Sequence, residues 1–109
     1  MFKIINNTIN ITRGDTGAFT LDIKAPDGSA YNYSNDTVLF TVKESVYSPE
    51  PLIQKEVHYG EIVTILPEDT ASLPYGDFYV YDVQVTTVHG IVDTVITPSK
   101  FAIRTEVTF

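Results

Sequence analysis

The sequence predicts an all-β fold, a sandwich of about eight short strands in a single domain covering residues 1–109. Three observations favour this fold. Apolar and polar residues alternate with a period of two in the longest apolar segments, as they do in half-buried strands. Turn residues separate these segments at the spacing of a sandwich or barrel. Val, Ile and Thr are abundant, beside seven Tyr and six Phe, and these residue types favour strands.

The expected strands follow this alternation along the chain. In residues 37–43 the apolar positions are Val38, Phe40 and Val42, and residues 77–86 repeat the pattern with Tyr and Val. We expect the strands at residues 17–24 and 37–43 to lie in different sheets. The candidate segments are Phe2–Ile5, Thr8–Thr12, Gly17–Lys24, Thr37–Lys43, Leu52–Val57, Glu61–Leu66, Asp77–Thr86, Ile91–Thr97 and Lys100–Val107.

Two connections have a recognisable form. Residues 88–91, with Gly90 in the turn, predict a tight hairpin between two long strands. Residues 67–73 predict one short helical turn. Pro67 suits its first position, the acids Glu68 and Asp69 suit its positive N-terminal end, and Pro74 closes it.

Charge and composition disfavour several classes of partner. The net charge of −7 makes nucleic acid and anionic membrane surfaces unfavourable, since both require clustered Lys and Arg. The absence of cysteine excludes disulfides, thiolate metal sites and cysteine nucleophiles. No apolar run has the length of a membrane span, and residues 1–7 lack the apolar core of a signal peptide. We therefore expect synthesis and folding in the cytoplasm.

The ionisable residues do not form a recognisable catalytic or metal-binding motif. His58 and His89 are isolated and each precedes a turn glycine, which indicates surface turns rather than zinc ligands. Glu68 and Asp69 lack the alternating ligands of a calcium loop and any sign of a glycosidase cleft. Asp82 is expected to pair with Arg104 or cap a turn. We therefore expect no catalytic residues, no cofactor and no metal.

Two further features suggest contacts with other molecules. Arg13-Gly14-Asp15 matches the integrin-recognition tripeptide, but we favour a turn before the strand at residues 17–24, because so short a motif often occurs by chance. Tyrosines at loops or strand ends form a candidate interaction surface, with an alternative role as lids over the open ends of a sandwich. They are Tyr31, Tyr33, Tyr47, Tyr59 and Tyr75.

The order of several segments resembles a known group of proteins. These segments are residues 11–16 (ITRGDT), 37–43 (TVLFTVK), 66–73 (LPEDTASL), 79–85 (YVYDVQV), 90–96, 100–103 and 106–108. Their order is similar to that in small β-sandwich structural proteins of phages and prophages of Gram-positive bacteria, including the N-terminal domain of baseplate upper proteins. The resemblance implies an immunoglobulin-like antiparallel β-sandwich that serves as a virion building block, without catalytic residues. The chain departs from the baseplate proteins in ending at Phe109.

Three hypotheses follow from the sequence. The first is a non-enzymatic structural or assembly protein of a virion, in a tail, baseplate or head fibre, that contacts other virion proteins and forms homo-oligomers through strand edges and tyrosines. The second is a host-side binding module for cell-wall carbohydrate or a surface protein. The third, with the least support, is a small hydrolase that combines Glu68 or Asp69 with His58 or His89.

Overall fold

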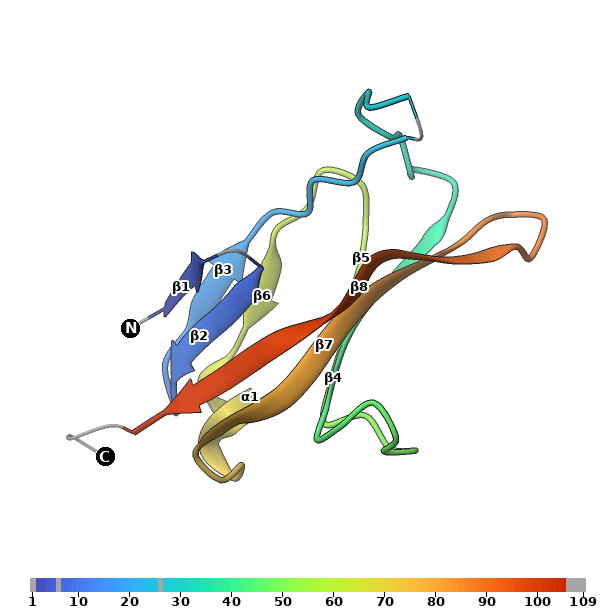
Figure 1. The fold of residues 1–109 in the computed structure, drawn as a ribbon. Helices are drawn as coiled ribbons and strands as arrows, with labels where there is room; N and C mark the ends of the chain where they lie inside the picture. The colour runs from blue at the N-terminus through green and yellow to red at the C-terminus, as the bar shows by residue number, and fades with distance from the viewer. Residues whose placement is uncertain (1, 6, 26, 106–109) are drawn as a thin grey trace.

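The computed structural model describes residues 2–5, 7–25 and 27–105, and within them the chain is mostly β, as the sequence predicts. A curled six-stranded sheet has the strand order β1-β2-β8-β7-β4-β5, and a two-stranded sheet joins β3 to β6 (Figure 1). The strands are β1 (Phe2–Ile5), β2 (Thr8–Thr12), β3 (Gly17–Phe19), β4 (Thr37–Lys43), β5 (Ile53–Val57), β6 (Val63–Ile65), β7 (Gly76–Thr86) and β8 (Val92–Arg104).

The core lies between the inner face of the large sheet and the β3–β6 pair. Every second residue is buried in β4 from Val38 to Val42 and in β7 from Tyr79 to Val85, which confirms the predicted alternation. Phe40 of β4 has no exposed surface. The centre of its ring lies 5.4 Å from the ring centre of Phe19 on β3 and 5.5 Å from that of Tyr81 on β7. Val63 and Ile65 of β6 belong to the same buried cluster. The two sheets therefore share one core.

The expectation of a purely antiparallel arrangement is wrong at β2 and β8. These two strands pair in parallel, with Ile9 opposite Phe101 and Thr12 opposite Arg104, while the other strand pairs of both sheets are antiparallel. Antiparallel direction is forced only where a short hairpin joins two strands. β2 and β8 lie near opposite ends of the chain, so no hairpin restricts their relative direction, and the sheet is mixed.

Two predicted strands have different bounds in the structure. The segment at residues 17–24 forms a ladder only over Gly17–Phe19, because its partner β6 spans three residues. Ile23 beyond it is still buried, and its carbonyl oxygen accepts the N–H of Tyr31 beside an isolated antiparallel bridge between Lys24 and Ala30, so the predicted face continues outside the β3–β6 ladder. The strands β3 and β4 lie in different sheets, which confirms that prediction.

The two C-terminal segments form one strand rather than two. β8 runs through Pro98, where register shifts against β7 leave an extra residue in the ladder. A proline is accommodated at such a bulge or at an unpaired strand edge, because its missing N–H is not required there. The strand ends at Arg104, and residues 106 and 107 of the predicted segment lie outside the described residues. The hairpin at residues 88–91 is confirmed, with Gly90 at a φ of 80°.

The predicted helical turn is confirmed as α1 (Pro67–Ala71), which precedes β7. The backbone N–H of Leu66 donates to Oδ2 of Asp69 at 2.7 Å, so that this carboxylate caps the helix. The same oxygen lies 2.8 Å from Nζ of Lys55 on β5, and this ion pair ties the helix to the large sheet. The described part of the chain contains no helix with the length and apolarity that crossing a membrane requires.

We predict that Phe40→Ala lowers the free energy of unfolding by about 3–5 kcal/mol, because it removes the ring that contacts both sheets and leaves a cavity. Urea denaturation followed by tyrosine fluorescence measures the change. Tyr47→Ala is the control, since Tyr47 is 92% exposed, and it should change the free energy by less than about 0.5 kcal/mol. Equal losses for the two variants would contradict the proposed position of the core.

Candidate functional site

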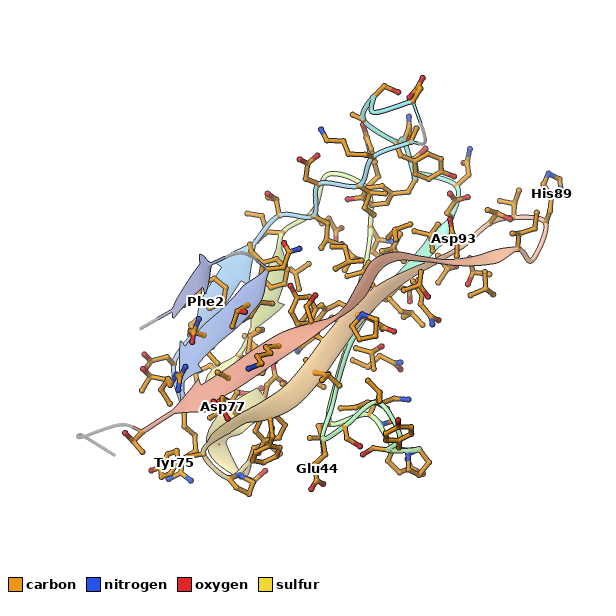
Figure 2. All side chains as sticks on the ribbon, in the orientation of Figure 1. Phe2, Glu44, Tyr75, Asp77, His89 and Asp93 are labelled. Carbon is orange, nitrogen blue, oxygen red and sulfur yellow. The ribbon has the colours of Figure 1, made fainter. Side chains whose placement is uncertain are left out.

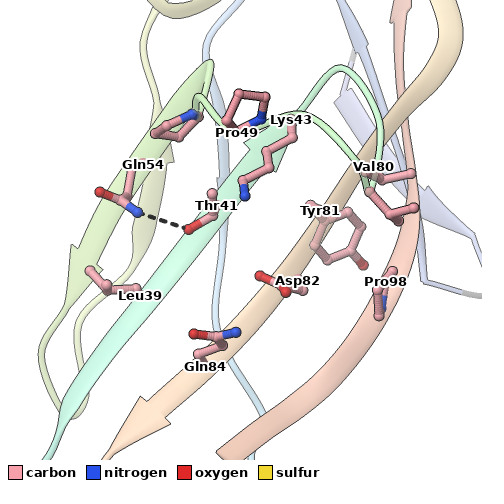
Figure 3. A pocket seen from close by; sticks show the side chains of 12 residues that line it. Leu39, Thr41, Lys43, Pro49, Gln54, Val80, Tyr81, Asp82, Gln84 and Pro98 are labelled. Atoms are coloured by element: carbon pink, nitrogen blue, oxygen red, sulfur yellow. Dashed lines mark hydrogen bonds between the residues drawn. The ribbon is translucent and has the colours of Figure 1, made fainter. Parts of the chain in front are cut away.

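A groove lies on the outer face of the large sheet, on the side away from the core. β4, β5, β7 and β8 form its floor, and the connection between β4 and β5 forms a wall (Figure 3). Its volume is about 320 Å³. The floor carries mainly polar side chains, namely Thr41, Lys43, Gln54, Asp82 and Gln84, while Val46, Pro49, Pro51 and Pro98 supply apolar sides.

The strand register explains why these floor residues meet. Residues that alternate with the buried positions point outward, so the odd residues of β4 and the even residues of β7 share the outer face. Thr41 lies opposite Gln54 of β5 and opposite Asp82 of β7. The Nε2 amide of Gln54 donates to Oγ1 of Thr41 at 3.2 Å. These three side chains therefore form one row across the floor.

Within this row, Gln54 and Thr41 are hydrogen-bonded to each other, whereas Asp82 is not bonded to either. Its carboxylate is half-buried and has no hydrogen bond or ion pair to any other described residue. Burial raises the pKa of the Asp82 carboxyl above its ordinary value, and the charge of Lys43 opposes this shift. The expected pairing with Arg104 is wrong, because the Arg104 guanidinium donates to Oδ1 of Asn10 at 3.0 Å. Asp82 is thus an acceptor directed into the groove.

The predicted tyrosine surface is not one surface. Tyr33 is only 5% exposed and lies in the core, so its assignment to an exposed surface is wrong. The ring of Tyr59 covers it edge-on at 5.0 Å, which is the lid role that the sequence offered as an alternative. The hydroxyl of Tyr31 donates to Asp36 in the same loop, and this hydrogen bond raises the pKa of Tyr31.

The remaining two tyrosines lie apart from this loop. Tyr47 is 92% exposed in the connection between β4 and β5, beside the groove wall. Tyr75 lies directly before β7, near Asp77 (Figure 2). The guanidinium carbon of Arg13 lies 4.3 Å above the centre of its ring. Of the five tyrosines, Tyr47 is the one that best fits an open contact surface.

The Arg13-Gly14-Asp15 segment is a packed turn. Arg13 rests on Tyr75, and the N–H of Gly14 donates to Oγ1 of the buried Thr70 in α1 at 2.9 Å. Gly14 has a φ of 83°, which favours glycine. The N–H of Asp15 donates to the carbonyl oxygen of Thr12. These contacts favour the structural interpretation of the tripeptide over an exposed recognition loop.

The candidate hydrolase residues do not converge. Asp69 is held by Lys55 and by the start of α1, as described above. His58 is exposed where β5 ends, and His89 is exposed at the tip of the β7–β8 hairpin (Figure 2). In the described ranges, no group of three or more His, Asp or Glu side chains is arranged to hold a metal ion.

The sequence indicates the polar residues on the groove floor but not the loop that forms its wall. The polar residues Asp82 and Gln84 fall on the outer face of a strand whose period of two is visible in the sequence. The position of Pro49 and Pro51 against this face depends on the path of a loop, for which no local pattern exists. The groove was therefore not predicted.

We predict that Thr70→Val destabilises the protein by about 1–3 kcal/mol, since the partly buried N–H of Gly14 then loses its acceptor. Denaturation in urea measures the loss, and hydrogen exchange at Gly14 should become faster. Thr87→Val is the matched control, because Oγ1 of Thr87 accepts an exposed N–H from Ile91 that water can satisfy. A loss no larger than that of the control would argue against the anchored turn.

We predict that Asp82→Asn stabilises the protein at pH 7, by about 0.5 kcal/mol as for a partly exposed position, and has little effect near pH 3. A carboxyl with a raised pKa in the folded state lowers stability as the pH rises through that pKa. Asp27→Asn is the control of opposite sign, because hydrogen bonds from Ser29 lower the pKa of Asp27. Urea titrations at both pH values give the comparison, and changes of the same sign at pH 7 would contradict the prediction.

Comparison with known proteins gives no relative for this chain. No family model matches it, and no significant match occurs among curated proteins or solved structures. The resemblance to phage and prophage sandwich proteins therefore stays a prediction.

Proposed function

We propose that this chain is a non-enzymatic structural or assembly protein of a phage or prophage virion, in a tail, baseplate or head fibre, and acts through contacts with other proteins. The observation that carries the proposal is the tip of the β7–β8 hairpin, which projects from the body of the molecule (Figure 1). Its apolar residues Val88, Ile91 and Val92 are 67%, 64% and 58% exposed. Apolar groups that gather at one exposed place are typical of protein contact sites.

We further propose that the fold is an immunoglobulin-like sandwich in which β3 and β6 form the second layer. The order β8-β7-β4-β5 corresponds to the G-F-C-C′ order of variable-type sheets, and the β3–β6 pair corresponds to strands B and E. The hydroxyl of Tyr79 donates to the carbonyl oxygen of Pro74 at 2.6 Å. This bond resembles the tyrosine corner of that fold, whose tyrosine lies near the start of the same strand. These correspondences support the proposed sandwich fold.

A host-side binding module is the second candidate. Tyr47 is almost fully exposed beside a groove that contains amide, hydroxyl, ammonium and carboxylate groups. Such groups bind sugars when an aromatic ring lies beside them. A screen of purified protein against cell-wall glycans tests this function, with Tyr47→Ala as the comparison. Binding that Tyr47→Ala abolishes would favour the module, and absence of binding would count against it.

We predict that mass spectrometry of purified particles, obtained after induction of the source strain, detects this chain at stoichiometric levels. We expect this result because a structural protein stays with the particle through purification. Its copy number then indicates which part of the virion it builds. An abundant host protein of similar size serves as the contamination control. If the chain is abundant in cells but absent from particles, the structural role is wrong.

A further inference from the structure

Two of the strand edges are poor docking sites, although the sequence suggested strand edges as contacts. β2 pairs with β8 only at Phe101–Arg104, so the edge from Val92 to Lys100 has no strand beside it in the described chain. Pro98 and the register shifts interrupt this edge. The short strand β5 forms one end of the sheet and carries the charged residues Lys55 and Glu56. Proline, bulges and charges are the devices that prevent edge-to-edge pairing.

The tip of the β7–β8 hairpin, residues 86–92, contains no Asp, Glu, Lys or Arg, unlike these edges, and it exposes apolar side chains. Residues 86–92 carry no carboxylate, in a chain whose net charge is −7, so a second copy repels this segment less than it repels acidic surfaces. Two apolar side chains, Val88 and Ile91, flank His89 at its end. An imidazole donates hydrogen bonds to carboxylates in either protonation state. The tip thus combines apolar contact with one hydrogen-bond donor.

The groove offers the complementary features. Its sides present Val46, Pro49 and Pro51, and its floor contains the Asp82 carboxylate, which lacks a partner among the described residues. Gln84 lines the groove on β7, and Val88 follows it by four residues, roughly 13 Å in an extended chain. Because the same strands carry both features, one copy cannot place its own tip in its own groove. A tip that enters the groove therefore comes from a second copy of the chain.

We propose that the hairpin tip of one copy docks in the outer-face groove of a second copy, with Val88 and Ile91 against the proline wall and His89 donating to Asp82. This inference rests on the proposed function and names the contact that such a building block uses. The two surfaces differ, so the contact is head-to-tail. Head-to-tail contacts form rings when their rotation closes and open filaments when it does not.

The test uses sedimentation and light scattering of the full chain over a range of concentrations. Wild-type protein should self-associate. Ile91→Ser alters the tip and Thr41→Trp fills the groove, and each should weaken self-association about tenfold or more, as expected for residues central to an interface. Ile62→Ser, at a 60% exposed apolar residue outside the tip, and Thr64→Trp, on the other sheet, are the matched controls and should associate like wild type.

Mixing the two altered proteins gives the decisive result. Ile91→Ser retains an intact groove and Thr41→Trp retains an intact tip, so together they should form a one-to-one pair at concentrations where each alone does not self-associate. A monomeric mixture, a monomeric wild type at high concentration, or equal losses in the controls would overturn the inference. Circular dichroism checks folding, and Asp82→Ala replaces Thr41→Trp if the latter does not fold.

These outcomes separate the inference from the proposed function. If particles contain the chain while purified protein stays monomeric, the virion role stands and the tip-in-groove contact is wrong. If the mixture pairs as expected but particles lack the chain, the contact is right and the virion role is wrong.

Discussion

The structure depends on the burial of one sheet face against a much smaller second sheet. Phe40 is central to this packing, because its ring contacts Phe19 across the core and Tyr81 within its own sheet. A two-stranded sheet buries little apolar area by itself and has little stability in isolation. β3 and β6 therefore persist because the large sheet curls over them, and the large sheet remains ordered because they fill its concave face.

This burial also determines the outer surface. In a strand with a period of two, each residue fixed inward fixes its neighbours outward. The inward positions of Tyr81 and Val83 place Asp82 on the outer face, where Thr41 and Gln54 continue the row. The position of the groove thus follows from the packing of the core. Burial of the Asp82 carboxylate, which has no partner among the described residues, is unfavourable, and a binding partner that donates a hydrogen bond would relieve it.

The short helix α1 holds together the connections at one end of the molecule. Asp69 caps α1 and binds Lys55, while Thr70 of the same helix accepts the N–H of Gly14. One short helix therefore joins the β5 strand and the turn before β3. The Arg13-Gly14-Asp15 turn is one of the parts that this helix holds, and its arginine packs on Tyr75. These contacts hold the Arg13-Gly14-Asp15 turn against α1 and Tyr75, which differs from the exposed, free loop of a recognition site.

The sequence by itself determined the β class, the alternating faces of β4 and β7, the hairpin at Gly90 and the helical turn that begins at Pro67, because each rests on neighbouring residues and local geometry. Only the tertiary structure decided the parallel pairing of β2 with β8, the continuity of β8 through Pro98, the burial of Tyr33 and the groove. These features join segments that are distant in the chain, and which distant segments meet depends on how the whole core packs rather than on any local pattern.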